Sequence, residues 1–222
     1  MNSPLLQLLV LAGIAVFLIL RLRSVLGTRD GFEKPPVSGP EKAARAAPRR
    51  PEFEVIEGRP DEDITDHVPQ GSDAADALAR MKAADRDFVV GDFLQGARGA
   101  YEMILMAFEK GNMEGVRGFL AEDVHESFDE VIREREAQGL TIEAEFVGIR
   151  EVSLVDATFD TSSRLGEVTV RFVGELTSVV RDANGEIVEG SPTEVRRQKD
   201  VWTFARVMGS DDPNWQLVAT GE

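Results

Sequence analysis

The sequence predicts an α+β domain in which several helices are followed by a curved, four-stranded antiparallel sheet. Three observations lead to this prediction. Apolar residues recur at helical spacing between residues 73 and 138, and after Gly139 the apolar period changes to two. The dipeptide Asn184-Gly185 then separates two of the alternating segments, as expected for a tight β-hairpin. Helices that precede an antiparallel meander pack together on one face of its sheet.

Four helical stretches are expected before the period changes. The first is rich in alanine and weakly amphipathic, whereas the second has a continuous apolar face from Phe93 to Phe108. Asp92 is the predicted N-cap of this second helix, and Gly111 is predicted to end it. The four stretches cover residues 73–88, 92–111, 114–120 and 124–138.

Four strands rich in Val, Ile, Phe, Trp and Thr are expected next. A two-residue type I′ turn at Asn184-Gly185 is predicted to join the second and third strands. Residues 211–214, with the sequence D-D-P-N, are predicted to turn between the third and fourth strands. The predicted strands are Ile142–Asp156, Gly166–Arg181, Glu194–Val207 and Trp215–Thr220.

Residues 1–26 are predicted to form a transmembrane anchor. The run from Leu5 to Leu20 is almost entirely apolar. As a helix it spans about 24 Å, against roughly 30 Å for the hydrocarbon core of a bilayer. Arg21 and Arg23 follow the run, and their stems extend it by snorkelling. A cleaved signal peptide is the alternative, but it carries positive charge before its apolar run. The positive-inside rule then places the rest of the chain in the cytoplasm.

Residues 27–70 are predicted to be a disordered linker. They hold seven of the ten prolines, and their composition cannot bury enough apolar surface to offset the entropy of ordering. Residues 21–51 carry eight Lys/Arg against three Asp/Glu, whereas residues 52–70 carry one against seven. The basic half is expected to stay near anionic lipid. We interpret Glu52–Ile56 as plain linker, with a short strand or a docking motif as the alternative.

The predicted folded domain, residues 71–222, is strongly acidic. It carries 16 Lys/Arg against 30 Asp/Glu, which disfavours contact with the phosphates of nucleic acid. The chain contains no cysteine, and this excludes disulfides, thiolate metal sites and thiol catalysis. We therefore expect no nucleic-acid partner for this domain.

No motif of known catalytic chemistry stands out. His67 lies in the predicted linker, and we interpret His125, on a charged helix, as a solvated surface residue. Neither histidine begins a metal-ligand spacing. Neither a P-loop nor a G-x-S-x-G motif occurs. The sequence thus predicts a binding protein rather than an enzyme, with no metal and no cofactor.

A set of bulky residues is left without a catalytic role. In V-W-T-F-A-R, strand alternation directs Trp202, Phe204 and Arg206 to one face, and Arg206 is expected to reach water near the strand end. Ordinary core is one interpretation of the set, and a hydrophobic pocket between helices and concave sheet is the other. An arginine in register with two rings suits a pocket that anchors a polar head, and equally a cation–π contact within the sheet. The candidate pocket residues are Tyr101, Phe128, Phe172, Trp202, Phe204, Arg206 and Trp215.

F-L-Q-G-A-R-G-A-Y-E-M-I at Phe93–Ile104 is similar to a helix of the Tim44-like family, which is named after a subunit of the mitochondrial import translocase. D-V-W-T-F-A-R at Asp200–Arg206, followed by D-D-P-N-W-Q-L-V-A-T at Asp211–Thr220, resembles the family's C-terminal motifs. Val188 and Gly190 after the hairpin turn also fit. With the predicted anchor, the resemblance points to the α-proteobacterial, TimA-type branch.

The resemblance implies a cystatin-like or nuclear-transport-factor-two-like cone with a large apolar pocket. It implies an adaptor at the bacterial inner membrane, single-pass and with its C-terminal domain in the cytoplasm. Such an adaptor recruits or tethers a protein partner, for example a translocase, a chaperone or an assembly factor. A module that binds lipid or a small hydrophobic ligand in the same pocket is the alternative. An isomerase- or dehydratase-like enzyme is a further alternative, and it needs a buried Asp or His that faces the pocket.

Overall fold

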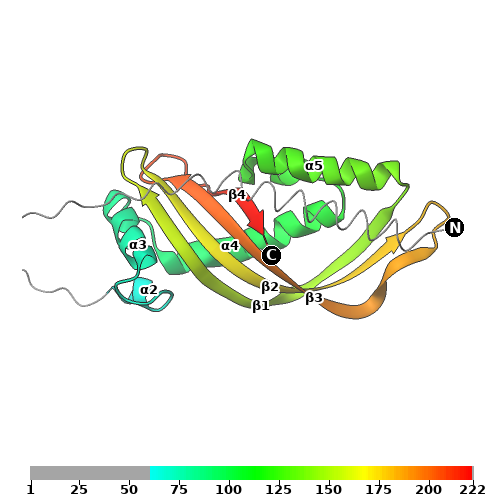
Figure 1. Ribbon diagram of the computed structural model, residues 1–222, viewed down its shortest axis with the longest axis horizontal. Helices are drawn as coiled ribbons and strands as arrows, with labels where there is room; N and C mark the ends of the chain where they lie inside the picture. The colour runs from blue at the N-terminus through cyan, green and yellow to red at the C-terminus, as the bar shows by residue number, and fades with distance from the viewer. Residues whose placement is uncertain (1–60, 222) are drawn as a thin grey trace, which may run out of the picture. The chain divides into compact units, whose positions relative to one another are not determined.

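The computed structural model describes residues 61–221, which belong to one compact unit of the chain (Figure 1). Within this range, none of the helices combines the length and the apolar character that crossing a bilayer requires. The linker up to residue 60 lies outside the described residues, as does the predicted anchor at residues 1–26 with Leu5, Leu20, Arg21 and Arg23.

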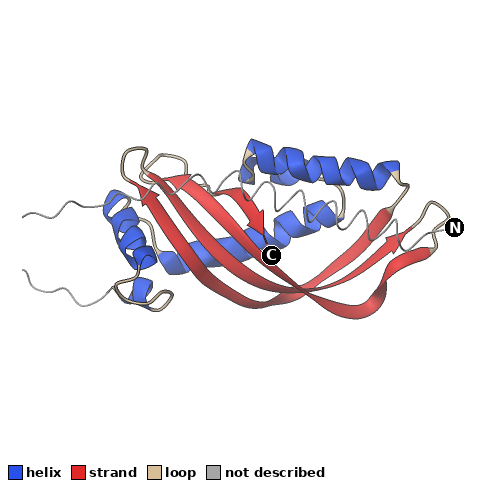
Figure 2. Cartoon of the chain, viewed as in Figure 1, coloured by secondary structure: helices blue, strands red, loops and turns tan. Residues whose placement is uncertain are grey.

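The described chain is α+β, as the sequence predicts: helical elements come first and an antiparallel sheet follows (Figure 2). The strand order is β1-β2-β3-β4, so each strand pairs with its neighbour in sequence. The helical elements are α2 (Glu62–Thr65), α3 (Asp73–Ala84), α4 (Val90–Glu109), the 3-10 helix η1 (Glu114–Phe119) and α5 (Glu122–Ala137). The strands are β1 (Thr141–Asp160), β2 (Leu165–Arg181), β3 (Ile187–Val207) and β4 (Gln216–Gly221).

The long helix α4 runs along the concave face of a strongly curved sheet, with α5 beside its C-terminal half (Figure 1). Helices α2 and α3 gather at the other end of α4. Bulges bend β1, because an extra residue in one strand kinks it and increases its twist. The register between β1 and β2 shifts at Phe146/Gly148, Ile149/Glu151 and Leu154/Asp156. The predicted curved sheet is confirmed, and its curvature makes the hollow that α4 fills.

Tyr101 of α4 is fully buried in this hollow and holds the helix against the sheet. Its ring stacks on Phe172 of β2, with centroids 4.5 Å apart and planes 11° apart, and lies 4.8 Å from the ring of Trp202. Its hydroxyl donates a hydrogen bond of 2.6 Å to Oδ2 of Asp200. Burial, and then this hydrogen bond, raises the pKa of Tyr101, so the phenol keeps its proton. Gly174 of β2 leaves room for the hydroxyl, because a Cβ there would lie 2.7 Å from its oxygen.

The start of α4 differs from the prediction. Asp92 is not its N-cap, because α4 begins at Val90 after a residue without a side-chain cap hydrogen bond. The Asp63 carboxylate, from α2, takes this role by accepting from the N–H groups of Val90 at 2.8 Å and Gly91 at 2.9 Å. Burial raises the pKa of Asp63, but Lys82 and the two N–H groups outweigh burial and hold it below its usual value. A cap that comes from 27 residues upstream leaves no local signal in the sequence.

Helix α2 lies in the stretch predicted to be disordered linker, so the packed chain begins before the predicted boundary at residue 71. The Asp61 side chain caps α2 by accepting from the N–H of Asp63. Ile64 is 5% exposed and Val68 is 6% exposed, so both belong to the core. Two apolar residues in an acidic stretch are too few to form a recognisable period, which is why the pattern did not reveal them.

The β2–β3 hairpin is present, but its turn is not the predicted type I′ turn. That turn needs a positive φ at both central residues. Gly185 has φ +82°, whereas Asn184 does not share this conformation, since Arg164 is the one non-glycine residue of 61–221 with a positive φ. The Asp182 carboxylate instead accepts from the N–H groups of Asn184 and Glu186, both at 2.9 Å, and stabilises a wider loop.

Strand β3 is longer than predicted, because it starts at Ile187 rather than at Glu194. Its first part is exposed on both faces and contains Gly190 and Pro192, so the alternation that marks a half-buried strand is missing there. The other predicted strands agree with the structure to within a few residues at each end.

The interpretation of His125 as a solvated residue is wrong. Its side chain lies in the core region at 6% exposure, with Nδ1 3.4 Å from Oδ2 of Asp129. The residue shares a helix face with the buried Ile132, seven positions later, so the helical period places it inward.

We predict that Gly174→Ala destabilises the domain by about 1–3 kcal/mol, the usual cost of overpacking a core. The new methyl group would meet the Tyr101 hydroxyl, which cannot move away because Asp200 holds it. Chemical denaturation measures the change. Gly99→Ala in α4, where a Cβ would meet nothing within 4 Å, is the control and should stabilise by about 0.5–1 kcal/mol. Equal effects of the two substitutions would show that Tyr101 does not need the space at Gly174.

Candidate functional site

A pocket opens at the N-terminal end of α4, between this helix and the loop that joins β3 to β4. Its volume is about 330 Å³, at the small end of ligand pockets in proteins. Its lining comes from the α3–α4 connection, the first half of α4, η1, the end of β3 and the β3–β4 loop. The lining residues are Asp87, Phe88, Val89, Asp92, Phe93, Gly96, Ala97, Ala100, Phe119, Phe204, Arg206, Pro213, Asn214 and Trp215.

Five aromatic rings line the pocket, and the four that contact one another are here called the aromatic floor: Phe88, Phe93, Phe204 and Trp215. The centroid of the Trp215 ring lies 4.6 Å from that of Phe93 and 5.7 Å from that of Phe88. Phe93 meets Phe204 edge to face, with centroids 6.0 Å apart. The three phenylalanines are buried, whereas Trp215 is partly exposed, so Trp215 is the ring that a bound group contacts most readily.

Arg206 closes the inner wall of the pocket. Its Nη2 donates to Oδ2 of Asp85 at 2.5 Å, and the two side chains are 13% and 12% exposed. Its Nη1 donates to the carbonyl of Pro213 at 3.3 Å, and its guanidinium carbon lies 5.2 Å from the centroid of the Trp215 ring. The N–H of Gly209 donates to the same Asp85 oxygen at 3.1 Å. Arg206 is therefore a largely buried clamp that connects the α3–α4 connection to the β3–β4 loop, rather than the water-reaching group that its place near the strand end suggests.

Two exposed carboxylates, Asp87 and Asp92, lie at the mouth of the pocket, and we call them the acidic mouth. Neither forms an ion pair with a cation among residues 61–221. Arg206, the one cation in the lining, is already paired with Asp85. The mouth is therefore negative and favours a cationic group in whatever approaches it.

The structure brings three of the seven candidate pocket residues to this pocket: Phe204, Arg206 and Trp215. Tyr101, Phe172 and Trp202 instead lie in the core at 0%, 0% and 4% exposure, so the core interpretation fits them. Phe128 packs on Phe108, with ring centroids 4.9 Å apart, beside the C-terminal half of α4.

Sequence reasoning missed several residues of the site. Phe88 and Phe93 belonged to predicted apolar helix faces, and nothing in their spacing distinguishes a pocket wall from a core face. Asp85 gives no signal either, because its partner Arg206 lies 121 residues away. The acidic mouth was visible only as two aspartates in a chain that contains 40 acidic residues.

The lining of the pocket contains no histidine, cysteine, serine or lysine. Across residues 61–221, no three His, Asp or Glu side chains lie together in a way that could hold a metal ion. The expectation that the protein needs no metal or cofactor stays a prediction.

A second charged cluster lies at the other end of α4, where Glu109 faces Arg135 of α5. Burial raises the pKa of Glu109, and Arg135, Ser178 and Arg196 oppose this rise without cancelling it. Ser178 donates a long hydrogen bond of 3.5 Å to Glu109, and the Arg135 guanidinium lies 4.1 Å from the centroid of the Phe108 ring. Burial also lowers the pKa of Arg135. The cluster lies away from the pocket, and we expect it to affect the stability of the domain.

Comparison with known proteins identifies related sequences. Residues 74–222 match the family model described as Tim44-like domain. The mitochondrial import inner membrane translocase subunit TIM44-1 of Arabidopsis thaliana is 22% identical over 162 residues, which cover 70% of this chain and 34% of that protein. The subunit TIM44 of Homo sapiens is 27% identical over 118 residues, which cover 52% of this chain and 25% of that protein. The match thus spans about a third and a quarter of the two relatives.

Among solved structures, the intermembrane space region of the chloroplast protein ARC6 matches 58% of this chain and 94% of its own, with a TM-score of 0.39 and 13% identity. A likeness of this size carries no argument about fold or function.

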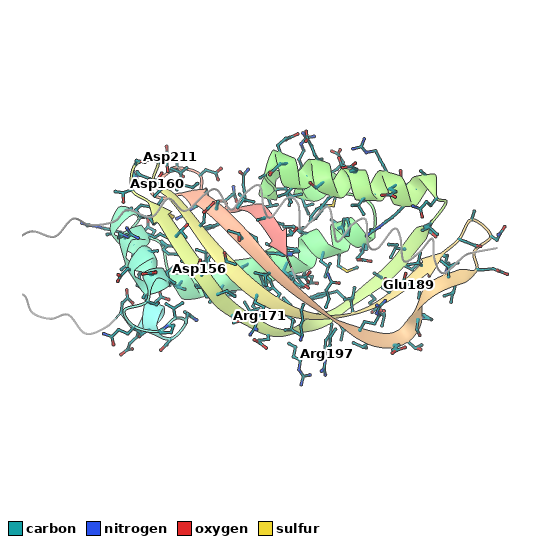
Figure 3. All side chains as sticks on the ribbon, viewed as in Figure 1. Asp156, Asp160, Arg171, Glu189, Arg197 and Asp211 are labelled. Carbon is teal, nitrogen blue, oxygen red and sulfur yellow. The ribbon has the colours of Figure 1, made fainter. Side chains whose placement is uncertain are left out.

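We predict that Arg206→Ala destabilises the domain by about 3–5 kcal/mol, because it leaves the carboxylate of a buried pair without its partner. Arg171→Ala is the matched control, since Arg171 lies on the convex, outer face of the sheet (Figure 3). It pairs with Glu151, and the side chains of Arg171 and Glu151 are 51% and 49% exposed. Such an exposed pair contributes about 0–1 kcal/mol. Chemical denaturation of both variants compares the losses. A small loss for Arg206→Ala, similar to that of the control, would show that the clamp is not structural.

We predict that Glu109 makes the domain less stable as pH rises. Its folded pKa lies above its usual value, so its contribution is fully present below the unfolded pKa and is lost as pH rises through the folded pKa. Glu109→Gln should therefore gain stability relative to the unchanged chain between about pH 4 and pH 7. Glu102→Gln, at an exposed position of the same helix, is the control. A difference that does not change with pH, measured by denaturation at both ends of this window, would contradict the prediction.

Proposed function

The chain belongs to the Tim44-like domain family, and on this premise we propose that it is a membrane-anchored adaptor. Residues 1–26 hold it in the bacterial inner membrane, and the domain lies in the cytoplasm. The pocket at the N-terminal end of α4 binds a segment of a protein partner. The apolar run Leu5–Leu20 and the arginines after it support the anchor. Two relatives are named as subunits of an inner-membrane import translocase, which supports a partner connected with protein translocation.

The observation that carries this proposal is the aromatic floor under an open, acidic mouth. Trp215 is partly exposed beside two buried phenylalanines, and pockets of this kind receive the anchor side chain of a partner. Asp87 and Asp92 favour a partner segment that carries Lys or Arg next to its apolar anchor. The charge of Arg206 is already paired with that of Asp85, so the partner does not need to neutralise it.

An enzymatic role receives no support from the chemistry of the pocket. An isomerase- or dehydratase-like reaction needs a buried acid or base that faces the substrate. The two free carboxylates of the lining are exposed, and its one cation is paired. We therefore propose that the protein works by binding and has no catalytic activity of its own.

A lipid- or small-ligand-binding module is the second candidate function, and the aromatic floor favours it. The acidic mouth opposes it for anionic head groups, because two unpaired carboxylates repel a phosphate. The two functions differ in what the pocket contacts in the cell.

We predict that a photo-crosslinking amino acid at Val89 forms a covalent adduct with a protein when cells are irradiated. Val89 lines the pocket at 38% exposure. Val155 on β1, at 53% exposure and outside the pocket lining, is the matched control, because the same chemistry there should capture little. Immunoblotting followed by mass spectrometry identifies the adducts.

The adduct should stay with membranes that have been washed with carbonate, and the domain should resist protease added to spheroplasts. A lipid adduct at Val89 would favour the second function. Equal capture from Val89 and Val155, or release of the protein by carbonate, would contradict the adaptor proposal.

A further inference from the structure

A second pocket lies at the end of α3, where this helix meets the turn between β1 and β2 (Figure 1). Its volume is about 380 Å³, similar to that of the pocket at α4. We call it the basic pocket, because one arginine from α3 and one from the turn line it. The lining residues are Arg80, Ala83, Ala84, Phe159, Thr161 and Arg164.

The fold holds the guanidinium of Arg164 in place. Its Nη2 donates a hydrogen bond of 2.9 Å to the carbonyl of Ala84, the last residue of α3. Gly209 leaves the space for this group, because a Cβ at that position would overlap Nη2. The cation is therefore positioned before any ligand arrives, which lowers the entropy cost of binding.

The backbone of Arg164 is strained. Its φ is +60°, and it is the one non-glycine residue of 61–221 with a positive φ. Glycine or asparagine adopts this conformation at lower energy, so the turn itself does not need an arginine here. Residues held in such conformations cluster at functional sites. The strain therefore points to a role for the side chain.

Both arginines of the basic pocket are exposed and available to an added anion. Neither forms an ion pair with a carboxylate of the described chain, although residues 71–222 carry 30 Asp/Glu. The carboxylate of Asp160, at the start of the turn, accepts from the hydroxyls of Ser162 and Ser163, each at 2.7 Å. It is thus occupied within its own turn.

The lining favours a single carboxylate next to an apolar group. Guanidinium groups bind a carboxylate through paired N–H donors, and Phe159 with two alanines supplies an apolar surface beside them. Acidic residues far outnumber basic ones in the domain, so each further negative charge on a ligand is opposed by the surrounding field. This field disfavours a phosphate dianion, or the surface of an anionic bilayer, relative to one Asp or Glu side chain.

We propose that the basic pocket receives an Asp or Glu side chain of the protein partner, together with an apolar neighbour of that residue. The inference rests on the proposed function as an adaptor. The two pockets adjoin one short connection, since Ala84 lines the basic pocket and Asp87 lines the pocket at α4. Three residues span at most about 11 Å, so one extended partner segment can contact both pockets. Such a segment carries Lys or Arg for the acidic mouth and, a few residues away, Asp or Glu for the basic pocket.

Saturation-transfer NMR with small probes tests the selectivity for a carboxylate, using the full chain in nanodiscs of neutral lipid and empty nanodiscs as the blank. N-acetylphenylalanine is the probe, because it joins a carboxylate to an apolar ring, and its amide is the uncharged control ligand. The acid should bind more tightly than the amide. Arg164→Gly and Arg80→Gln should each weaken binding of the acid by about tenfold or more, as expected for a charged hydrogen bond, and should leave the amide unaffected.

Arg133→Gln is the matched control for Arg80→Gln, and it should leave binding of the acid unchanged. Both arginines are exposed on a helix, and both donate from Nε to the carbonyl four residues earlier. Arg164→Gly should keep its denaturation midpoint, because glycine adopts this φ without strain and so offsets the lost hydrogen bond. If Arg164→Gly fails to fold, Arg80→Gln decides the question.

Two results would overturn the carboxylate site. One is equal binding of the acid and its amide, or binding of the acid that Arg80→Gln leaves unchanged. The other is tighter binding of phenyl phosphate than of the acid, which would assign the pocket to a phosphate group such as a lipid head group.

Photo-crosslinking in cells separates this inference from the proposed function. A photo-crosslinking amino acid at Ala83, which is exposed and lines the basic pocket, should capture the same protein as the one at Val89, through a peptide that contains Asp or Glu. A lipid adduct at Ala83, or a different protein, overturns the shared contact. Loss of the Val89 adduct while the acid still binds would contradict the proposed function and leave the carboxylate site in place.

Discussion

The hydrogen bond between Tyr101 and Asp200 fixes the position of α4 in the sheet, and the other features of the domain depend on this position. The phenol is completely buried and meets the carboxylate at 2.6 Å, so the middle of the helix is joined to β3 at one point. A buried hydroxyl without its partner is costly, and α4 therefore cannot slide along the concave face without losing stability. Gly174 permits the close approach, because any larger residue would occupy the place of the hydroxyl. Because this contact lies at the middle of α4, it does not determine what surrounds the two ends of the helix.

The two ends of α4 do differ, and the residues at the N-terminal end explain why a pocket forms there. At the N-terminal end, small residues such as Gly96 and Ala100 face the loop between β3 and β4, and they leave space that no side chain fills. The pair of Arg206 and Asp85 holds that loop in place, so the space persists as a pocket. At the C-terminal end, α5 covers the helix and buries Glu109 among cations. The same curved sheet thus has an open pocket at one end of the helix and a partly buried charged cluster at the other.

Local patterns in the sequence predicted most of the fold, whereas contacts between distant residues could not be predicted. The change of apolar period placed the helices and strands, because burial of one face imposes that period on any chain. Asn184-Gly185 located the hairpin but not its turn type, which depends on the carboxylate of Asp182. The cap from Asp63 and the partner of Arg206 lie 27 and 121 residues from their contacts, and no local pattern encodes such distances. Part of the aromatic floor could therefore be predicted from aromatic residues on strands, whereas the acidic mouth could not.

If the pocket binds as proposed, the charge that it presents and the ion pair behind it come from different residues. Arg206 is the one cation of the lining, and Asp85 neutralises it, so the charge of the pocket comes from the exposed mouth. A group that enters contacts Trp215 and the mouth, but it does not need to break the clamp behind them. Affinity is then governed by the apolar anchor and the cations that the incoming segment brings, since burying apolar area contributes about 25 cal/mol per Å² whichever chain supplies it. A partner segment that supplies both an apolar anchor and cations meets this requirement.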